Sequence, residues 1–115
     1  MPPGKPLSTE VFQLIIDGIF SGSVPDMDEV AKRLARSRRS LQEKLKKEGS
    51  GFRDLLQAAR KQVALNFLYR QDASVCEIAF MLGYSDQSAF THAFRRWTGQ
   101  SPKDIQKNSM LNIAE

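Results

Sequence analysis

Hydrophobic residues recur every three or four positions along most of this chain, which is the spacing of one face of an α-helix. The pattern is dense in "LSTEVFQLIIDGIF", where Ser8 is placed to cap the first turn and "SGSVP" ends the helix. It is longest in "FRDLLQAARKQVALNFLYRQ", which predicts one connecting helix. Because segments that alternate strictly, as strands do, are almost absent, we predict an all-α fold.

Two segments of the chain repeat one pattern. "VAKRLARSRRSLQEKLKKEG", residues 30–49, aligns with "IAFMLGYSDQSAFTHAFRRWTG", residues 78–99, when the second carries two extra residues. The matched apolar pairs are Val30 and Ile78, Leu34 and Leu82, Leu41 and Phe90, and Leu45 and Phe94. Each copy predicts a short amphipathic helix, a tight turn and a second amphipathic helix. That is the outline of a helix-turn-helix, and it occurs twice.

The predicted helix ends support this division. Asp26 with Glu29, and Ser74 with Glu77, have the spacing of a capping box before the first helix of each copy. We expect Ser37 and Ser85 to start the second helices. In the second copy Gly83 can take the positive φ of a sharp turn, whereas the first copy has Ala35 at that position.

The second helix of each copy has one apolar and one polar face. On residues 86–97 the apolar face predicts core, and it consists of Ala89, Phe90, Ala93, Phe94 and Trp97. The opposite face carries Ser88, Thr91, His92 and Arg95, and the first copy carries Arg39, Gln42, Glu43 and Lys46 opposite its leucines. Side chains of these types can bind base edges and phosphates in a DNA major groove.

Charge is concentrated in one part of the chain. The whole chain has a net charge of +4. The segment from Lys32 to Lys61 has a net charge of +8, from eleven Lys or Arg against three acids (11 − 3), and the rest of the chain is net negative. Such a run is often only a solvated face, but it also suits a polyanion partner. A basic face that binds an acidic protein is therefore the alternative to DNA. RNA is less favoured, because the major groove of an RNA helix is too narrow for these helices.

Size and composition predict one folded domain in the cytoplasm. The chain has 115 residues, 41% of them hydrophobic and 26% charged, with no apolar segment long enough to span a membrane and no secretory signal. Its single cysteine, Cys76, cannot form an internal disulfide, and we expect it to be a small buried hydrophobe with an inert thiol.

The sequence contains no pattern typical of an enzyme, and we predict that the chain is not one. Cys76 and the single histidine, His92, do not match the ligand spacing of a zinc site, and no glycine-rich phosphate loop or nucleophile elbow is present. We therefore predict no metal and no cofactor. His92 is instead a candidate base reader.

"IAFMLGYSDQSAFTHAFRRWTGQSP" closely resembles the signature segment of the AraC/XylS family of bacterial transcription regulators, and "FRDLLQAARKQVALNFLYR" resembles that family's linker helix. The resemblance covers about residues 8–107. The residues that stand at the family's spacing are Gly83, Ser85, Phe90, Phe94, Gly99 and Pro102. It implies about seven helices, with two helix-turn-helix subdomains joined by a long linker helix, and both recognition helices in successive major grooves.

The resemblance also implies the site, its limits and its partners. Base or backbone contacts fall on Arg39, Gln42, Glu43 and Lys46 in the first subdomain, residues 8–51, and on Gln87, Ser88, Thr91, His92 and Arg95 in the second, residues 72–107. Phosphate contacts fall on Ser37, Arg38, Ser40, Ser85 and Arg96. The linker helix, residues 52–71, joins the two subdomains. A flexible N-terminus, residues 1–7, precedes them, and a C-terminal tail, residues 108–115, follows them. The implied partners are a double-stranded DNA operator, RNA polymerase, and a sensor or dimerisation domain of the parent protein.

Overall fold

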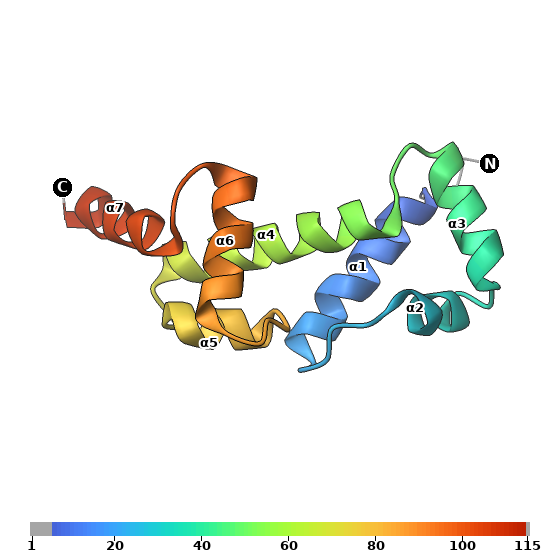
Figure 1. Cartoon of the computed structure of the whole chain (residues 1–115), viewed down its shortest axis with the longest axis horizontal. Helices are drawn as coiled ribbons and strands as arrows, with labels where there is room; N and C mark the ends of the chain where they lie inside the picture. The colour runs from blue at the N-terminus through green and yellow to red at the C-terminus, as the bar shows by residue number, and fades with distance from the viewer. Residues whose placement is uncertain (1–5, 115) are drawn as a thin grey trace. The chain divides into compact units, whose positions relative to one another are not determined.

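The computed structural model describes the backbone of residues 6–114 and the side chains of residues 6–108. Within that range the chain forms seven α-helices and no strand, in the order α1 (Leu7–Phe20), α2 (Met27–Arg33), α3 (Arg38–Lys47), α4 (Phe52–Arg70), α5 (Val75–Met81), α6 (Gln87–Thr98) and α7 (Pro102–Ala114) (Figure 1). The predicted fold, all helical with two helix-turn-helix units and one long helix between them, is confirmed.

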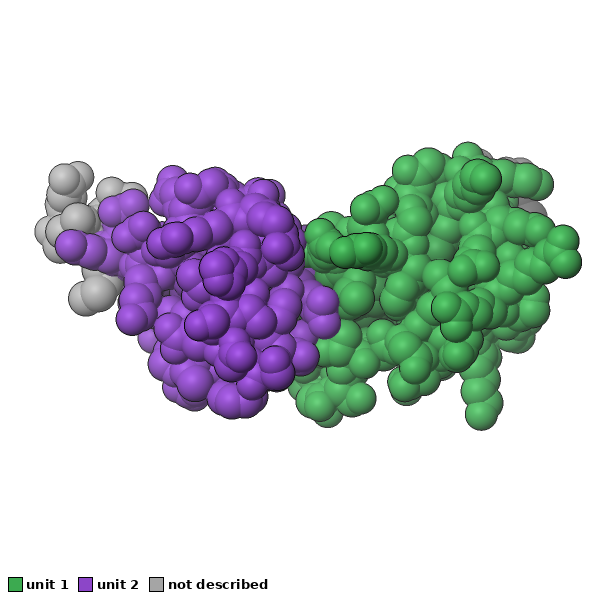
Figure 2. Space-filling view, viewed as in Figure 1, with its two compact units in different colours: residues 1–59 green, residues 60–115 purple. Residues whose placement is uncertain are grey.

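The chain divides into two compact units, residues 1–59 and 60–115 (Figure 2). The boundary falls inside α4, so this helix contributes residues to both units. Of the predicted N-terminal flexible segment, residues 1–5 lie outside the described residues, and α1 already begins at Leu7. Most side chains of the predicted C-terminal tail also lie outside them, although the α7 backbone runs to Ala114.

Aliphatic side chains fill the core of the first unit. They follow the three- and four-residue spacing of α1, α2 and α3, and they are Leu7, Val11, Ile15, Ile19, Val30, Ala31, Leu41 and Leu45. Leu41 and Leu45 are 0% and 1% exposed, so one side of α3 is wholly buried against α1 and α2. The other side of α3 is therefore left to solvent.

The start of α1 corrects one prediction. Ser8 does not cap this helix, since the helix begins one residue earlier and its N-cap, Pro6, has no capping side chain. The carboxylate of Glu48, the C-cap of α3, accepts the backbone N–H groups of Leu7 and Ser8 at 2.9 and 2.8 Å. A residue forty positions away thus satisfies amides that the helix leaves unpaired, and it ties α1 to the end of α3.

Aromatic side chains form much of the second unit's core. Phe90 and Phe94 are both 0% exposed, and their ring centres lie 5.7 Å apart in an edge-to-face pair. Ala93 is also buried, as predicted, whereas Ala89 and Trp97 are half-buried. The Trp97 ring still packs 6.3 Å from Phe94, with its indole N–H buried. The aromatics of α6 therefore fix this helix in its unit and are not a platform for stacking bases.

The two turns of the repeat have the same backbone geometry. After α2, the N–H groups of Ala35 and Arg36 donate to the carbonyls of Lys32 and Ala31, at 3.1 and 2.9 Å. After α5, Gly83 and Tyr84 make the equivalent bonds to Phe80 and Ala79, both at 3.0 Å. These are Schellman motifs, and the residue in the left-handed region is Ala35 at φ 55° in one and Gly83 at φ 89° in the other. The alanine therefore does not change the turn.

The caps of the repeat are mostly as predicted. Asp26 and Ser37 accept the N–H groups of Glu29 and Ser40, and Ser74 forms a complete capping box with Glu77. The exception is α6, whose N-cap is Asp86 rather than Ser85, with its carboxylate 2.8 Å from the Ala89 nitrogen. The longer turn of the second copy moves the start of α6 one residue along the chain.

The prediction for Cys76 is also wrong, because this side chain is exposed rather than buried. On the short helix α5 the buried positions are Val75, Ile78 and Ala79. Cys76 and Phe80, four residues apart, fall on the other side, where Phe80 is 62% exposed. Val75 and Cys76 are both apolar and adjacent in the sequence, so the sequence alone did not show which of the two faces the core.

Candidate nucleic-acid interface

The exposed side of α3 carries the predicted contacts of the first unit. Because Leu41 and Leu45 hold the helix against the core, all but one of these side chains face solvent. The exposed ones are Ser37, Arg38, Arg39, Gln42, Glu43 and Lys46. Ser40 is half-buried, and its hydroxyl oxygen accepts a hydrogen bond from Arg36 Nη1 at 3.3 Å.

Two ion pairs occupy cationic side chains at the start of α3. Arg39 Nε lies 3.2 Å from Glu43 Oε1, one helical turn away, and Arg38 Nη1 lies 3.3 Å from Asp28 Oδ1 on α2. The four side chains are 59–88% exposed, so each pair contributes only about 0–1 kcal/mol. Neither pair prevents these arginines from turning to a phosphate or a base. The Arg39–Glu43 contact also gives Glu43 a partner within the protein.

The exposed side of α6 carries the contacts predicted for the second unit. Ser88, His92, Arg95 and Arg96 are exposed on the helix, and Ser85 is exposed in the turn before it. Gln87 and Thr91 are half-buried, because they lie where α6 approaches α7. All of the predicted residues of this unit are thus outside the aromatic core, on or beside one helix.

A shallow hollow extends this surface towards α7. Gln87, Thr91 and Arg95 line it together with Ser101, Pro102 and Lys103 from the start of α7. Lys103 is exposed and adds a second cation beside Arg95. Sequence reasoning missed Lys103, because the predicted surface ended with α6. The only signal was its position directly after "SP", which is where a new helix begins.

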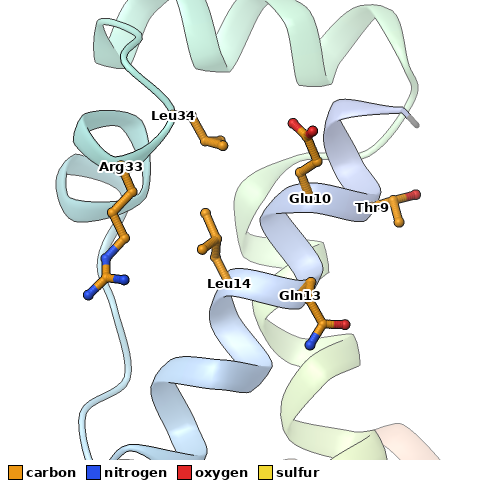
Figure 3. Close-up of a pocket in the computed structure, with 6 residues that line it drawn as sticks. All are labelled: Thr9, Glu10, Gln13, Leu14, Arg33 and Leu34. Atoms are coloured by element: carbon orange, nitrogen blue, oxygen red, sulfur yellow. The ribbon is translucent and has the colours of Figure 1, made fainter. Parts of the chain in front are cut away.

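The first unit has a further groove between α1 and the end of α2. Leu14 and Leu34 face one another across it, with Glu10 and Arg33 at its rim and Thr9 and Gln13 along α1 (Figure 3). None of the predicted contact residues lines this groove. The helix-turn-helix surface therefore does not include it.

Other kinds of site find no support in the described part of the chain. No three His, Cys, Asp or Glu side chains within it are grouped closely enough to hold a metal ion. None of its helices combines the length and the apolar composition that a membrane span requires.

Two helix-turn-helix units, each with its second helix buried on an apolar side and exposed on a polar one, define a DNA-binding domain. Comparison with known proteins agrees with this class. Residues 30–108 match the sequence pattern of the helix-turn-helix domain family. The chain belongs to this family, in its AraC-type branch, which the resemblance had indicated.

Similar proteins include transcription regulators of several bacteria. The ornithine utilization regulator of Pseudomonas aeruginosa is 38% identical over 86 residues, which are 75% of this chain and 25% of that protein. The crystal structure of a DNA-binding transcriptional dual regulator from Escherichia coli superposes with a TM-score of 0.87 at 26% identity, covering 96% of this chain and 98% of that one. The chain spans about a quarter of the length of the curated relatives that it matches.

A further structure shares the fold. It is a transcriptional regulator from Chromobacterium violaceum, described as an AraC-type DNA-binding domain-containing protein. Its TM-score is 0.80 at 22% identity, with 90% of this chain and 92% of that chain covered.

Proposed function

We propose that this chain binds double-stranded DNA at specific sequences, with α3 in one major groove and α6 in the next, and thereby regulates transcription. The observation that carries the proposal is the repeated exposure of one polar helix face per unit. In both units the buried face is apolar and the exposed face presents hydrogen-bonding and cationic side chains. A major groove admits one α-helix, and its base edges bind side chains of these kinds.

The proposed roles divide into base contacts and phosphate contacts. Arg39 and Gln42 read bases in the first groove, and Gln87, Thr91 and His92 read bases in the second. Glu43, Ser88 and Arg95 contribute base or backbone contacts beside them. Phosphate contacts come from Ser37, Arg38, Ser40, Lys46, Ser85 and Arg96. Lys103 joins them because it lies on the same hollow as Arg95.

The strong positive charge around α3 supports DNA over a neutral partner. The segment from Lys32 to Lys61 contributes +8, and the cationic residues of α3 are all exposed. Phosphate neutralisation by such residues supplies sequence-independent affinity and makes binding depend on salt. The basic face of α3 would thus contribute more to the sequence-independent affinity than the polar face of α6.

The setting of this activity is proposed from the family. Residues 8–51 and 72–107 act as the two DNA-reading parts and residues 52–71 as their linker. In a parent protein of the relatives' length, a sensor or dimerisation domain would control the DNA-binding domain. RNA polymerase would be the partner at a promoter, and the cytoplasm the compartment.

Selection of binding sites from a pool of random DNA duplexes tests the proposal. Tandem insertion predicts an enriched motif with two half-sites about one helical turn, or 10 base pairs, apart. Arg39→Ala should lower affinity for that motif by about 1–3 kcal/mol and relax the preference at one base pair. Equal loss of affinity for all duplexes would contradict base reading by Arg39. Absence of any enriched motif would contradict the proposed function, and binding to an acidic protein would then be the better account of the basic face.

A further inference from the structure

Arg60 on α4 reaches the turn that joins α5 to α6. Its Nε donates a hydrogen bond to the carbonyl oxygen of Leu82 at 3.0 Å, and its guanidinium carbon lies 4.8 Å from the centre of the Tyr84 ring. Leu82 is the C-cap of α5, where carbonyls lack partners in the helix and carry its partial negative charge. The guanidinium therefore satisfies this helix end and covers the aromatic ring of the turn with the same group.

Tyr84 in turn packs against α6. Its backbone N–H closes the turn on the carbonyl of Ala79 at 3.0 Å. Its ring centre lies 5.8 Å from that of Phe90 and 6.4 Å from that of Trp97, both on the inner side of α6. Contacts thus run without a break from Arg60 through Tyr84 to the core side of α6.

We propose that Arg60 is a positioning residue for DNA recognition by the second unit: it fixes the α5–α6 turn, and so the angle at which α6 presents its polar face. This inference rests on the proposed function, because the angle of α6 matters only if that helix reads DNA. Arg60 is half-buried, with its Nε used by Leu82 and its charged plane placed over Tyr84. It acts on DNA through the turn and not as a phosphate contact.

The first unit shows what the turn is like without such a group. The residue that corresponds to Tyr84 there is Arg36, which is exposed and whose Nη1 donates to Ser40 Oγ. No aromatic side chain lies at this position in the first copy. Loss of Arg60 should therefore disturb reading by α6 and leave reading by α3 unchanged.

Two substitutions separate positioning from charge. Arg60→Met keeps the apolar stem and removes the donor and the charge, whereas Arg60→Lys keeps the charge and loses the planar group with its Nε donor. Arg53→Met, at an exposed arginine of the same helix, is the control for loss of one charge. Affinity is measured on the duplex selected by the unaltered protein, and on duplexes with base changes in either half-site.

Both Arg60 variants should bind the selected duplex about tenfold more weakly, the effect of about one charge-assisted hydrogen bond. They should also lose discrimination in the half-site read by α6 while keeping it in the other. Rescue by Arg60→Lys would overturn the proposal, because a charge alone would then be sufficient. Equal loss of discrimination in both half-sites would also overturn it, since the effect would then be general unfolding.

A measurement without DNA tests the same contact. Burial raises the pKa of Tyr84, and the charges on Arg60 and Arg96 oppose that rise. In a Tyr69→Phe background, which leaves Tyr84 as the one tyrosine of the chain, tyrosinate absorbance reports this pKa directly. Arg60→Met should raise the Tyr84 pKa further, and an unchanged value would contradict the contact. If no duplex is selected, the proposed function fails, while this titration still tests the contact between Arg60 and Tyr84.

Discussion

Replacement of Ala35 by glycine should stabilise the first unit. Ala35 sits in the left-handed region at φ 55°, and its counterpart in the repeat, Gly83, has φ 89°. A left-handed conformation costs an L-residue roughly 1–2 kcal/mol. Glycine avoids that cost but loses more freedom on folding than alanine, by roughly 0.5–1 kcal/mol. The difference predicts a net gain of about 0.5–1 kcal/mol for Ala35→Gly.

Urea denaturation followed by circular dichroism measures this gain. The midpoint should rise while the slope stays the same, because the turn keeps its two hydrogen bonds and the exposed surface on unfolding does not change. A thermal scan should show a shift of about 2–4 °C. Sites on DNA should be bound with the same sequence preference, since the motif already has the geometry that glycine adopts.

Two substitutions give the matched controls. Gly83→Ala introduces the strain in the second unit and should cost about 0.5–1 kcal/mol. Ala58→Gly makes the same change as Ala35→Gly on an exposed position within α4, where the conformation is helical, and should cost about 1 kcal/mol. The reasoning is refuted if Ala35→Gly destabilises the protein as Ala58→Gly does.

Three further predictions concern single side chains. Lys46→Ala should weaken binding evenly on all duplexes and lower the slope of log affinity against log salt by about one, and a change confined to one sequence would contradict a phosphate contact. The hydrogen bond from the backbone of Ser8 lowers the pKa of Glu48 below its ordinary 4.5. The ionised Glu48 therefore stabilises the folded protein above pH 4.5, and this contribution is lost as the pH falls through the lowered pKa. Glu48→Gln should therefore be less stable than the unaltered protein near pH 7 and approach it in acid, as urea titrations at several pH values would show. Cys76, being exposed, should react with a maleimide in the folded protein, and protection until unfolding would contradict its placement.

Local patterns were sufficient to predict most of the fold. The spacing of apolar residues placed α3 and α6, and it separated their buried sides from the sides that carry Arg39 and His92. Caps such as Ser37 and Ser74 depend on neighbours within three residues, so the sequence alone contains what is needed to find them. Whether the exposed residues touch bases or phosphates stays a prediction, which the affinities of Arg39→Ala and Lys46→Ala on different duplexes test.

Features that depend on distant residues could not be predicted in this way. Glu48 caps a helix some forty positions away, and nothing near Glu48 in the sequence indicates a partner at the start of α1. Lys103 joins the α6 surface only because α7 begins beside it. Arg60 appears in the sequence as one more cation of a basic run, and its contacts with Leu82 and Tyr84 depend on how α4 packs against α5 and α6. The charge pattern of a segment shows how many cationic side chains it holds, but not which of them make contacts within the protein.

The two copies of the repeat differ more in what holds the turn than in the turn itself. Their backbone hydrogen bonds are equivalent, although one left-handed residue is Ala35 and the other Gly83. In the first copy the next residue, Arg36, is exposed, so backbone bonds and a capping serine define the turn. In the second, Tyr84 is packed between Arg60 and the aromatics of α6. The turn that both copies share is thus fixed locally in the first copy and by tertiary contacts in the second, so substitution of Arg60 should act on α6 more strongly than on α3.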